Sequence, residues 1–369
     1  MNVGGPAIQV TGLMTQISEV EFLQLLVAGY CEDGESDYLE AYGETFPIIR
    51  VSSLRRKLSV VKDIAAFFEL RQIMKRYRPD IIHTHTAKAG LLGRLASLST
   101  FDRHIRVHTF HGHLLHGYFS SFKTRMVVFI EKCLAAITTS IVAVGNNVKD
   151  DLLDQGIGCF SKYAVIGPGL SLQPIPSRKE SERNLGIHAD KFNVTWIGRA
   201  VKVKSPMRII EIAKETLRQG LDINFLIVGD GPLIPEMMKA TYEQNLNIEF
   251  LGWQNSIERV LAVSEIVILT SENEGTPVAL IQAQMAGIPV ITSDVGSASE
   301  VLINGKTGFC ETYSEEVFVN RIKELKADDG KRMHFGQAAT EFALKKFSLQ
   351  NLIDSHRSLY QKLIDQSNS

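Results

Sequence analysis

The chain has 369 residues, which is more than one average domain and predicts two domains of about 150–200 residues each. It is 44% hydrophobic and 22% charged, a composition typical of a globular protein with enough apolar side chains for two cores. The formal net charge is -1 and no long run of a single sign occurs, so nothing indicates a general attraction to nucleic acid.

The cysteines and the apolar runs indicate the cellular compartment in which the protein is expected. The four cysteines, Cys31, Cys133, Cys159 and Cys310, are far apart and form no C-x-x-C pair. With no signal peptide at the start, reduced thiols are expected. The apolar runs are short, and none approaches the ~20 residues that a membrane-spanning helix needs. We therefore predict a soluble cytoplasmic protein.

The chain opens with MNVGGPAIQVTGLM, in which two glycines and Pro6 precede a predicted helix. A glycine-rich turn that leads into a helix usually follows a strand, but only Met1, Asn2 and Val3 precede this one. We expect the true start to lie upstream, because that strand would normally lie inside the sheet. A fold that tolerates its loss is the alternative.

Short Val/Ile-rich runs then alternate with amphipathic stretches almost to the end of the chain. Such runs, without strict alternation, favour strands buried on both faces of a parallel sheet. Predicted strands in the first half are 22–28, 81–84, 106–110 and 141–144. Those in the second half are 193–197, 224–228, 248–251, 266–269 and 289–292.

One helix between these strands has a clear predicted start. Asp63 resembles an N-cap, and the helix ends before Pro79. The side chains expected to face the core are Ile64, Phe67, Phe68, Ile73 and Met74.

The alternation of strands and helices pauses at GPGLSLQPIPSR, residues 167–178, and then restarts. This pattern predicts an α/β protein with two doubly wound, Rossmann-like domains that face a cleft. The predicted division is an N-terminal domain over 1–168, a linker over 169–190 and a C-terminal domain over 191–347. A last helix within 348–369 has no strand after it and is expected to cross back to the first domain.

Ligands of doubly wound sheets bind at the carboxyl ends of the strands, so the turns that follow strands are candidate sites. GRAVKVK, residues 198–204, supplies Arg199 and Lys204, two cations that suit a diphosphate. Two solvated surface cations are the alternative. GDGP, residues 229–232, is a second tight turn, but it lacks the third glycine of a dinucleotide fingerprint. No G-x-x-x-x-G-K-[ST] loop occurs, so kinase or ATPase chemistry has no support.

ENEGTPVAL is a third candidate turn. Gly275 frees the backbone, and Pro277 suits the first helical turn because its missing N–H costs nothing there. The N–H groups around Thr276 and Val278 would bind an anion or a hydroxyl group. Glu274 suits sugar hydroxyls as an acceptor, although a glutamate near a helix start also complements the helix dipole.

Seven of the ten histidines lie before residue 117, and VHTFHGHLLHG resembles a zinc-binding cluster. No cysteine or carboxylate joins these histidines at ligand spacing, and the segment follows a strand rather than lying on a helix. We therefore predict no metal. His111 is expected to hydrogen-bond substrate, while His83 and His85 are interpreted as satisfied residues at a strand end.

In order along the chain, GGPA, TFHG, GR-x4-K, GDGP and E-G-x-P-x4-Q-A-x2-A-G-x-P-V resemble the GT-B glycosyltransferases of family 4, the group 1 retaining enzymes. The resemblance covers nearly the whole chain. It implies a retaining transfer of a sugar from a nucleotide-sugar donor, a UDP-sugar, to a saccharide or lipid-linked acceptor in bacterial surface-polysaccharide synthesis. It implies no cofactor, since the donor is a substrate, and no D-x-D motif is present to carry a metal.

The resemblance also implies roles for individual residues. Arg199 and Lys204 match the diphosphate-binding pair, and Glu274 matches the first acidic residue of an E-x7-E motif that contacts the donor sugar. His111 matches a histidine near the reacting sugar. The further substrate-binding positions that it implies are Gly4, Gly5, Gly198, Gly275, Thr276, Pro277 and Val278.

Gln282 departs from the pattern, because it occupies the place of the second glutamate. In the family that residue accepts hydrogen bonds from the nucleotide ribose, and a neutral amide oxygen also accepts them. We therefore expect weaker donor binding rather than loss of chemistry. A non-catalytic subunit, motivated by Gln282 and by the missing first strand, and a nucleotide-sugar epimerase are the alternatives.

Basic and aromatic residues in the first half favour peripheral contact with an anionic membrane. A solvated basic face beside core aromatics is the alternative. The residues are Arg50, Arg55, Arg56, Lys57, Lys123 and Arg125, with Tyr118, Phe119 and Phe122.

Overall fold

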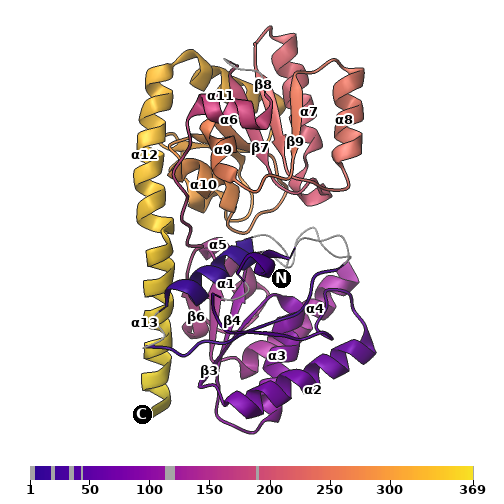
Figure 1. The fold of residues 1–369 in the computed structure, drawn as a ribbon, viewed down its shortest axis with the longest axis vertical. Coiled ribbons are helices and arrows are strands. Elements are labelled where there is room, and N and C mark those ends of the chain that lie inside the picture. The colour runs from indigo at the N-terminus through magenta and orange to yellow at the C-terminus, as the bar shows by residue number, and fades with distance from the viewer. Residues whose placement is uncertain are drawn as a thin grey trace. The chain divides into compact units, whose positions relative to one another are not determined.

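The computed structural model describes residues 5–17, 21–32, 37–42, 45–112, 121–187 and 191–368. These residues form two compact α/β units (Figure 1). The first unit contains the described residues up to 170 together with 348–368, and the second contains the described residues within 171–347. The sheets in both units are parallel, as predicted for Rossmann-like domains.

The first unit has a four-stranded sheet in the order β3-β4-β5-β6 and a separate parallel pair, β1-β2. The predicted strands near 81, 106 and 141 are confirmed, whereas the strand predicted over 22–28 extends only over its last three residues. The strands are β1 (Leu26–Ala28), β2 (Ile48–Arg50), β3 (Ile81–His85), β4 (Ile105–Phe110), β5 (Ser140–Ala143) and β6 (Tyr163–Val165). The helices are α1 (Gly5–Gln16), α2 (Val60–Tyr77), α3 (Ala87–Ser99), α4 (Ser121–Ile137), α5 (Asn146–Asp154) and α13 (Leu349–Asn368), with short 3-10 turns at Tyr38–Tyr42 and Phe160–Lys162.

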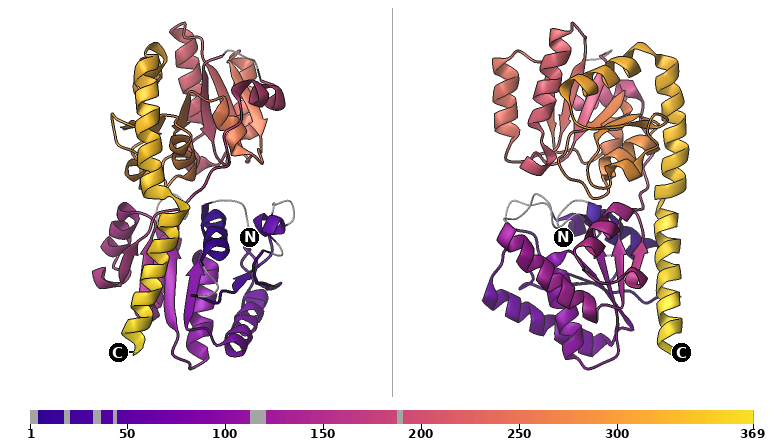
Figure 2. Two further views of the ribbon diagram at one scale, coloured as in Figure 1. Left: turned by 60° about the vertical axis from the view of Figure 1, so that its left-hand side comes forward. Right: turned by 180° about the vertical axis from the view of Figure 1, so that it is seen from behind.

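The last helix, α13, belongs to the first unit, as predicted for a helix that returns to it (Figure 2). Its buried residues Leu352, Ile353 and Leu363 pack with Leu13 and Ile17 near α1. The same apolar cluster includes Ile105, Val107, Val142 and Ile166. One face of this sheet is therefore covered by α1 and α13, while α2 and α3 pack in a different cluster that includes Ile82 of β3.

Helix α2 differs from its prediction at both its start and its face. The helix begins at Val60 with Ser59 as N-cap, and the Asp63 carboxylate accepts a hydrogen bond from the Ser59 N–H at 3.2 Å. Its buried residues are Ala66, Leu70 and Met74. Ile64 and Phe68 are 54% and 60% exposed, because two residues along a helix correspond to a rotation of about 200°. The prediction that both face the core is wrong.

The second unit has a six-stranded sheet in the order β12-β11-β10-β7-β8-β9. All five strands predicted here are confirmed with ends within one residue, and β12 was not predicted. The strands are β7 (Asn193–Ile197), β8 (Asn224–Val228), β9 (Ile248–Gly252), β10 (Ile266–Leu269), β11 (Val290–Ser293) and β12 (Gly308–Glu311). The helices are α6 (Arg178–Leu185), α7 (Met207–Arg218), α8 (Ile234–Glu243), α9 (Ile257–Ala262), α10 (Val278–Met285), α11 (Glu315–Ala327) and α12 (Asp329–Phe347), with 3-10 turns at Lys202–Lys204 and Ala298–Val301.

The core of the second unit surrounds Trp196 of β7, which is fully buried among isoleucines of α7 and phenylalanines of β8 and α11. Among the described residues, no helix has the length and apolar character that crossing a membrane requires. All four cysteines are free thiols.

Candidate functional site

The strand order of the second unit locates a candidate site. From β7 the chain continues to β8 on one side, and β10 returns on the other side of β7. Where the order reverses in this way, the loops after the two strands diverge and leave a crevice at their carboxyl ends. The loop after β7 carries Gly198, Arg199 and Lys204, and the loop after β10 carries Glu274 and Gly275. Two separate sequence motifs therefore meet at one edge of the sheet.

Lys204 and Glu274 form the centre of this site. The Lys204 Nζ lies 2.6 Å from each carboxylate oxygen of Glu274. The Glu274 residue is only 5% exposed, and the Ser271 hydroxyl donates to its Oε1 at 2.5 Å. The backbone oxygen of Glu274 accepts from the N–H of Ser297 at 3.1 Å. Glu274 is thus held at both its side chain and its backbone, and a group that reaches Lys204 also meets this carboxylate.

Arg199 behaves differently from Lys204. Its side chain is exposed, and among the described residues it has no hydrogen-bond or ion-pair partner. The guanidinium keeps all five N–H donors for a ligand, in a planar arrangement that matches phosphate oxygens. The site therefore offers one cation that is anchored to a buried carboxylate and one that is unengaged.

The GDGP loop supports the loop that carries these cations. The N–H of Ala200 donates to the Asp230 carbonyl at 2.6 Å, and the N–H of Gly198 donates to the Val228 carbonyl at 2.9 Å. Gly231 has a φ of +145°, and a Cβ there would lie 2.6 Å from the backbone of Ala200. Glycine is required because the two backbones are in contact. The GDGP turn therefore positions residues 198–204.

Helix α10 begins directly after Pro277. Pro277 is the N-cap, with an extended backbone, and Val278 is the first helical residue. The N–H groups of the first helical turn lack partners inside the helix, so they can face a ligand. Gln282 lies one turn after Val278 and is half-buried, and its side chain has no hydrogen-bond partner among the described residues. Its amide is therefore free to bind a hydroxyl group.

In the first unit, His111 follows β4 and contacts a residue that was not assigned to the site. Its Nε2 lies 2.9 Å from the Nδ1 of His85, the last residue of β3. His83 is a satisfied strand residue, as predicted, with Tyr360 Oη at 2.6 Å and Thr109 Oγ1 at 2.7 Å. His85 is also a satisfied residue at a strand end, as predicted, and its partner is His111.

The structure also shows where other predicted site residues lie. Gly5 is the first residue of α1, whereas Gly4 lies outside the described residues, as do His113 and His116. Within the described part of the chain, no group of three or more His, Cys, Asp or Glu side chains is arranged to hold a metal ion. The sequence reasoning missed Ser271 and His85. Both have a recognisable position in the sequence. Ser271 lies three residues before Glu274, and His85 directly follows the predicted strand 81–84, which pairs with the strand that precedes His111.

Acid should destabilise the first unit below neutral pH. Burial lowers the pKa of His111 and His356 to about 4, and it lowers the pKa of His83, His85 and His108 well below the ordinary value of 6.5. Because these folded-state values lie below the unfolded value, the stability that they contribute is complete above about pH 6.5 and is lost as the pH falls toward 4. Thermal unfolding followed from pH 7.5 to 4.5 should show this loss. His334→Asn, at an exposed position, should leave the pH dependence unchanged, and a flat profile in the parent protein would contradict the prediction.

Comparisons with known proteins give the family of the chain. Residues 10–173 match the family model of Glycosyltransferase Family 4, and residues 177–342 match that of Glycosyl transferases group 1. The chain is 29% identical to the UDP-Gal:alpha-D-GlcNAc-diphosphoundecaprenol alpha-1,3-galactosyltransferase of Escherichia coli, over 89% of this chain and 86% of the relative. It is 24% identical to the capsular polysaccharide biosynthesis glycosyltransferase CapM of Staphylococcus aureus, over 87% of this chain and 86% of the relative.

Solved structures show the same fold. HepE from Anabaena in complex with UDP and glucose matches with a TM-score of 0.82 at 19% identity, over 97% of this chain and 96% of HepE. The sucrose-phosphate synthase of Thermosynechococcus elongatus matches with a TM-score of 0.83 at 19% identity, over 99% of this chain and 94% of the synthase. The two family matches together extend over both units, and the chain belongs to the GT-B glycosyltransferases of group 1 and family 4.

Proposed function

We propose that this chain is a retaining glycosyltransferase that moves a sugar from a UDP-sugar to a saccharide or lipid-linked acceptor in bacterial surface-polysaccharide synthesis. The observation that carries the proposal is the Lys204–Glu274 pair, with the unengaged Arg199 in the same loop as Lys204, where the strand order of the second unit reverses. The names of two relatives support the choice of substrates, since one uses UDP-Gal and a diphosphoundecaprenol acceptor and the other serves capsule synthesis.

The charges of the site suit cleavage of the sugar–phosphate bond. As that bond breaks, positive charge develops on the sugar and negative charge develops on the departing diphosphate. Lys204 and Arg199, with the N–H groups at the start of α10, stabilise the leaving group, and each such donor is worth roughly 3–4 kcal/mol. Glu274 accepts hydrogen bonds from the sugar hydroxyls.

Retention of configuration follows from attack on the same face as the leaving group. The acceptor hydroxyl oxygen forms the new bond to the anomeric carbon, the bond to the diphosphate breaks, and the hydroxyl proton passes to a diphosphate oxygen. The protein supplies positioning and charge rather than a covalent partner. We propose that the reaction needs no metal, because two side-chain cations serve the leaving group and the sequence has no D-x-D motif.

A ligand screen and a product assay test the proposed function. Thermal shift across UDP, GDP and ADP and their sugars should show stabilisation by uridine nucleotides, since a bound ligand raises the unfolding temperature by mass action. The stabilising sugar nucleotide is then incubated with saccharide and lipid-diphosphate acceptors. Nucleotide binding without transfer would favour the non-catalytic subunit, and conversion of the donor without acceptor would favour an epimerase.

Replacing Gln282 with glutamate should tighten UDP binding about tenfold. A hydroxyl group bound to a charged acceptor gains about 1.5–3 kcal/mol, against about 0.5–1.5 kcal/mol for a neutral acceptor. The Gln282 amide has no competing partner among the described residues, so the new carboxylate meets the ligand directly. Calorimetric titration with UDP measures the change, with Gln282→Leu as the variant that loses the contact. Equal affinities in all three proteins would show that this side chain does not touch the nucleotide.

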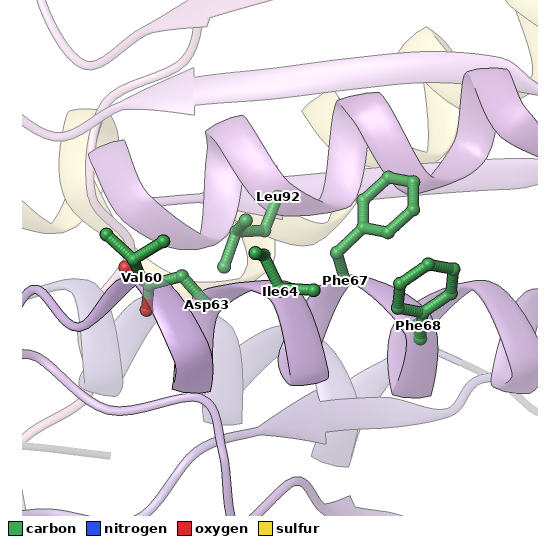
Figure 3. Close-up of a pocket in the computed structure, with 6 residues that line it drawn as sticks. All are labelled: Val60, Asp63, Ile64, Phe67, Phe68 and Leu92. Atoms are coloured by element: carbon green, nitrogen blue, oxygen red, sulfur yellow. The ribbon is translucent and has the colours of Figure 1, made fainter.

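The proposed lipid-linked acceptor raises the question of a membrane-facing surface. At the start of α2, five apolar side chains are 54–87% exposed, and Arg56, Lys57 and Lys62 are exposed among them. Figure 3 shows Val60, Ile64 and Phe68 of this helix around an open pocket that Leu92 of α3 also lines. The five exposed apolar residues are Leu58, Val60, Val61, Ile64 and Phe68, called here the α2 patch.

We propose that the α2 patch docks on an anionic bilayer, which combines apolar insertion with charge attraction. This patch differs from the membrane-contact residues predicted from the sequence. Arg50 is left out of it, because Arg50 is ion-paired with Asp37 and lies over the Tyr30 ring. Lys123 and Arg125 are exposed on α4, whereas Tyr118 and Phe119 lie outside the described residues.

The variant Ile64→Glu/Phe68→Glu should bind phosphatidylglycerol vesicles at least about tenfold more weakly than the parent protein, because two apolar anchors become anions. Vesicle co-sedimentation at low salt measures this binding. Tyr242→Glu is the matched control, since Tyr242 is 88% exposed in the second unit. A parent protein that ignores anionic vesicles would refute the proposal.

A further inference from the structure

We propose that His85 is a positioning residue for His111, which it holds in one ring orientation and one tautomer toward the substrate. The inference rests on the proposed function for its catalytic consequence, because that function gives His111 a substrate to meet. The contact itself lies entirely within the first unit.

The sheet brings the two rings together. β3 and β4 are neighbours, and their register pairs His85 with Thr109. His111 lies two residues after Thr109, directly after the end of β4 at Phe110. The His85 Nδ1 and the His111 Nε2 are 2.9 Å apart, with ring centroids at 5.1 Å and planes inclined by 33°. This is the distance of a hydrogen bond between two imidazoles.

Other rings hold His85 in place. His83 stacks on it, with centroids 4.3 Å apart and planes inclined by 29°. His83 is itself fixed at both nitrogens, by the Tyr360 hydroxyl of α13 and by the Thr109 hydroxyl of β4. His356 of α13 lies 5.7 Å from the His83 ring, between centroids. A chain of ring contacts thus runs from the last helix to His111, and His85 cannot turn without disturbing it.

The hydrogen bond couples the proton positions of the two rings, so the tautomer of His85 determines what His111 offers to a ligand. Burial lowers the pKa of both rings, so both are neutral at pH 7. A neutral imidazole has one donor nitrogen and one acceptor nitrogen. When His85 donates, the His111 Nε2 accepts and its Nδ1 carries the proton, and the reverse assignment holds when His85 accepts. Among the described residues, the His111 Nδ1 has no partner, so it is the nitrogen left for substrate.

Loss of this contact should affect turnover rather than nucleotide binding. Displacement of a reacting or orienting group by about 1 Å costs up to about 100-fold in rate. His85→Leu is therefore expected to lower kcat/KM about 10- to 100-fold, while the Kd for UDP stays unchanged because the candidate nucleotide site lies in the second unit. His85→Asn, whose amide reaches the Nδ1 position, should restore most of the activity.

The test combines kinetics with a structural readout that needs no substrate. Nitrogen-15 NMR of the imidazole rings reports the tautomer of His111 in the parent protein, in His85→Leu and in His85→Asn. His104→Leu is the matched control, because His104 is a buried histidine of the same unit whose partners are Pro79 and Thr100. We expect the His111 signals to change in His85→Leu alone, together with the loss of kcat/KM.

Two results would overturn the proposal. One is a His111 ring spectrum that is identical in the parent protein and in folded His85→Leu. The other is equal impairment of the leucine and asparagine variants, since a purely structural loss would not distinguish them. If the parent protein transfers no sugar at all, the proposed function fails, whereas the NMR comparison still decides whether His85 sets the tautomer of His111.

Discussion

Alanine in place of Lys204 or Glu274 is expected to lower kcat at least about 100-fold, because each variant removes a preorganised charge from the centre of the site. Lys204→Ala removes the ammonium that meets the developing diphosphate charge. Glu274→Ala removes the carboxylate that binds the sugar and holds the Lys204 Nζ at 2.6 Å. Initial rates at saturating donor and acceptor measure the effect.

The ion pair makes a sharper test possible. Because Glu274 is only 5% exposed, Lys204→Ala leaves a nearly buried carboxylate without its cation, so part of its effect is on stability. Glu274→Gln keeps the shape of the side chain and removes only its charge, which separates the two effects. Lys202→Ala is the matched control, since Lys202 is an exposed lysine in the same 3-10 turn.

The double variant Lys204→Ala/Glu274→Ala should be about as slow as either single variant, because the two groups act as one unit. Near-normal rates in both single variants, with the proteins folded, would refute the site. A rate loss in Lys202→Ala as large as in Lys204→Ala would show that general surface charge, rather than this pair, is responsible.

The strands were predictable because strands buried on both faces of a parallel sheet are continuous apolar runs. β7, β8 and β10 have the predicted ends for this reason. β12 was missed because its four residues, GFCE, mix a glycine and a glutamate with only two apolar residues. Pairing with β11 determines this strand, and such pairing leaves no local pattern in the sequence.

The face of α2 was mispredicted for a related reason. Val60, Val61, Ile64, Phe67 and Phe68 surround the start of the helix with apolar side chains, so periodicity does not distinguish a buried face from an exposed one. The core selects Ala66, Leu70 and Met74 and leaves the larger side chains outside. The excess of apolar residues was visible in the sequence, but its separation into two faces was not.

The residues of the candidate site were predictable as motifs, but their contacts were not. Lys204 and Glu274 are 70 residues apart, and they meet because β10 returns beside β7. His85 and His111 are 26 residues apart and meet because β3 pairs with β4 in one register. Both contacts depend on the order of strands, which a reading of separate motifs does not contain.

Breaking the ion pair between Arg94 and Glu131 is expected to have the largest effect on stability. Arg94 of α3 and Glu131 of α4 have side chains that are 1% and 4% exposed, with Nη2 and Oε2 at 2.8 Å. Burial lowers the pKa of the arginine and raises that of the glutamate, and in each case the charge of the partner opposes this shift. Glu131→Leu leaves a buried cation without an anion and should lower the free energy of unfolding by about 3–5 kcal/mol.

The matched double variant Arg94→Met/Glu131→Leu should recover most of that loss, because an apolar pair of similar volume needs no compensating charge. Glu215→Ala, which breaks an exposed pair with Arg218, is the control and should have little effect. Both tryptophans, Trp196 and Trp253, lie in the second unit, so circular dichroism or hydrogen exchange in α3 and α4 must replace tryptophan fluorescence. If the double variant is as unstable as Glu131→Leu, lost packing rather than the unpaired charge explains the defect.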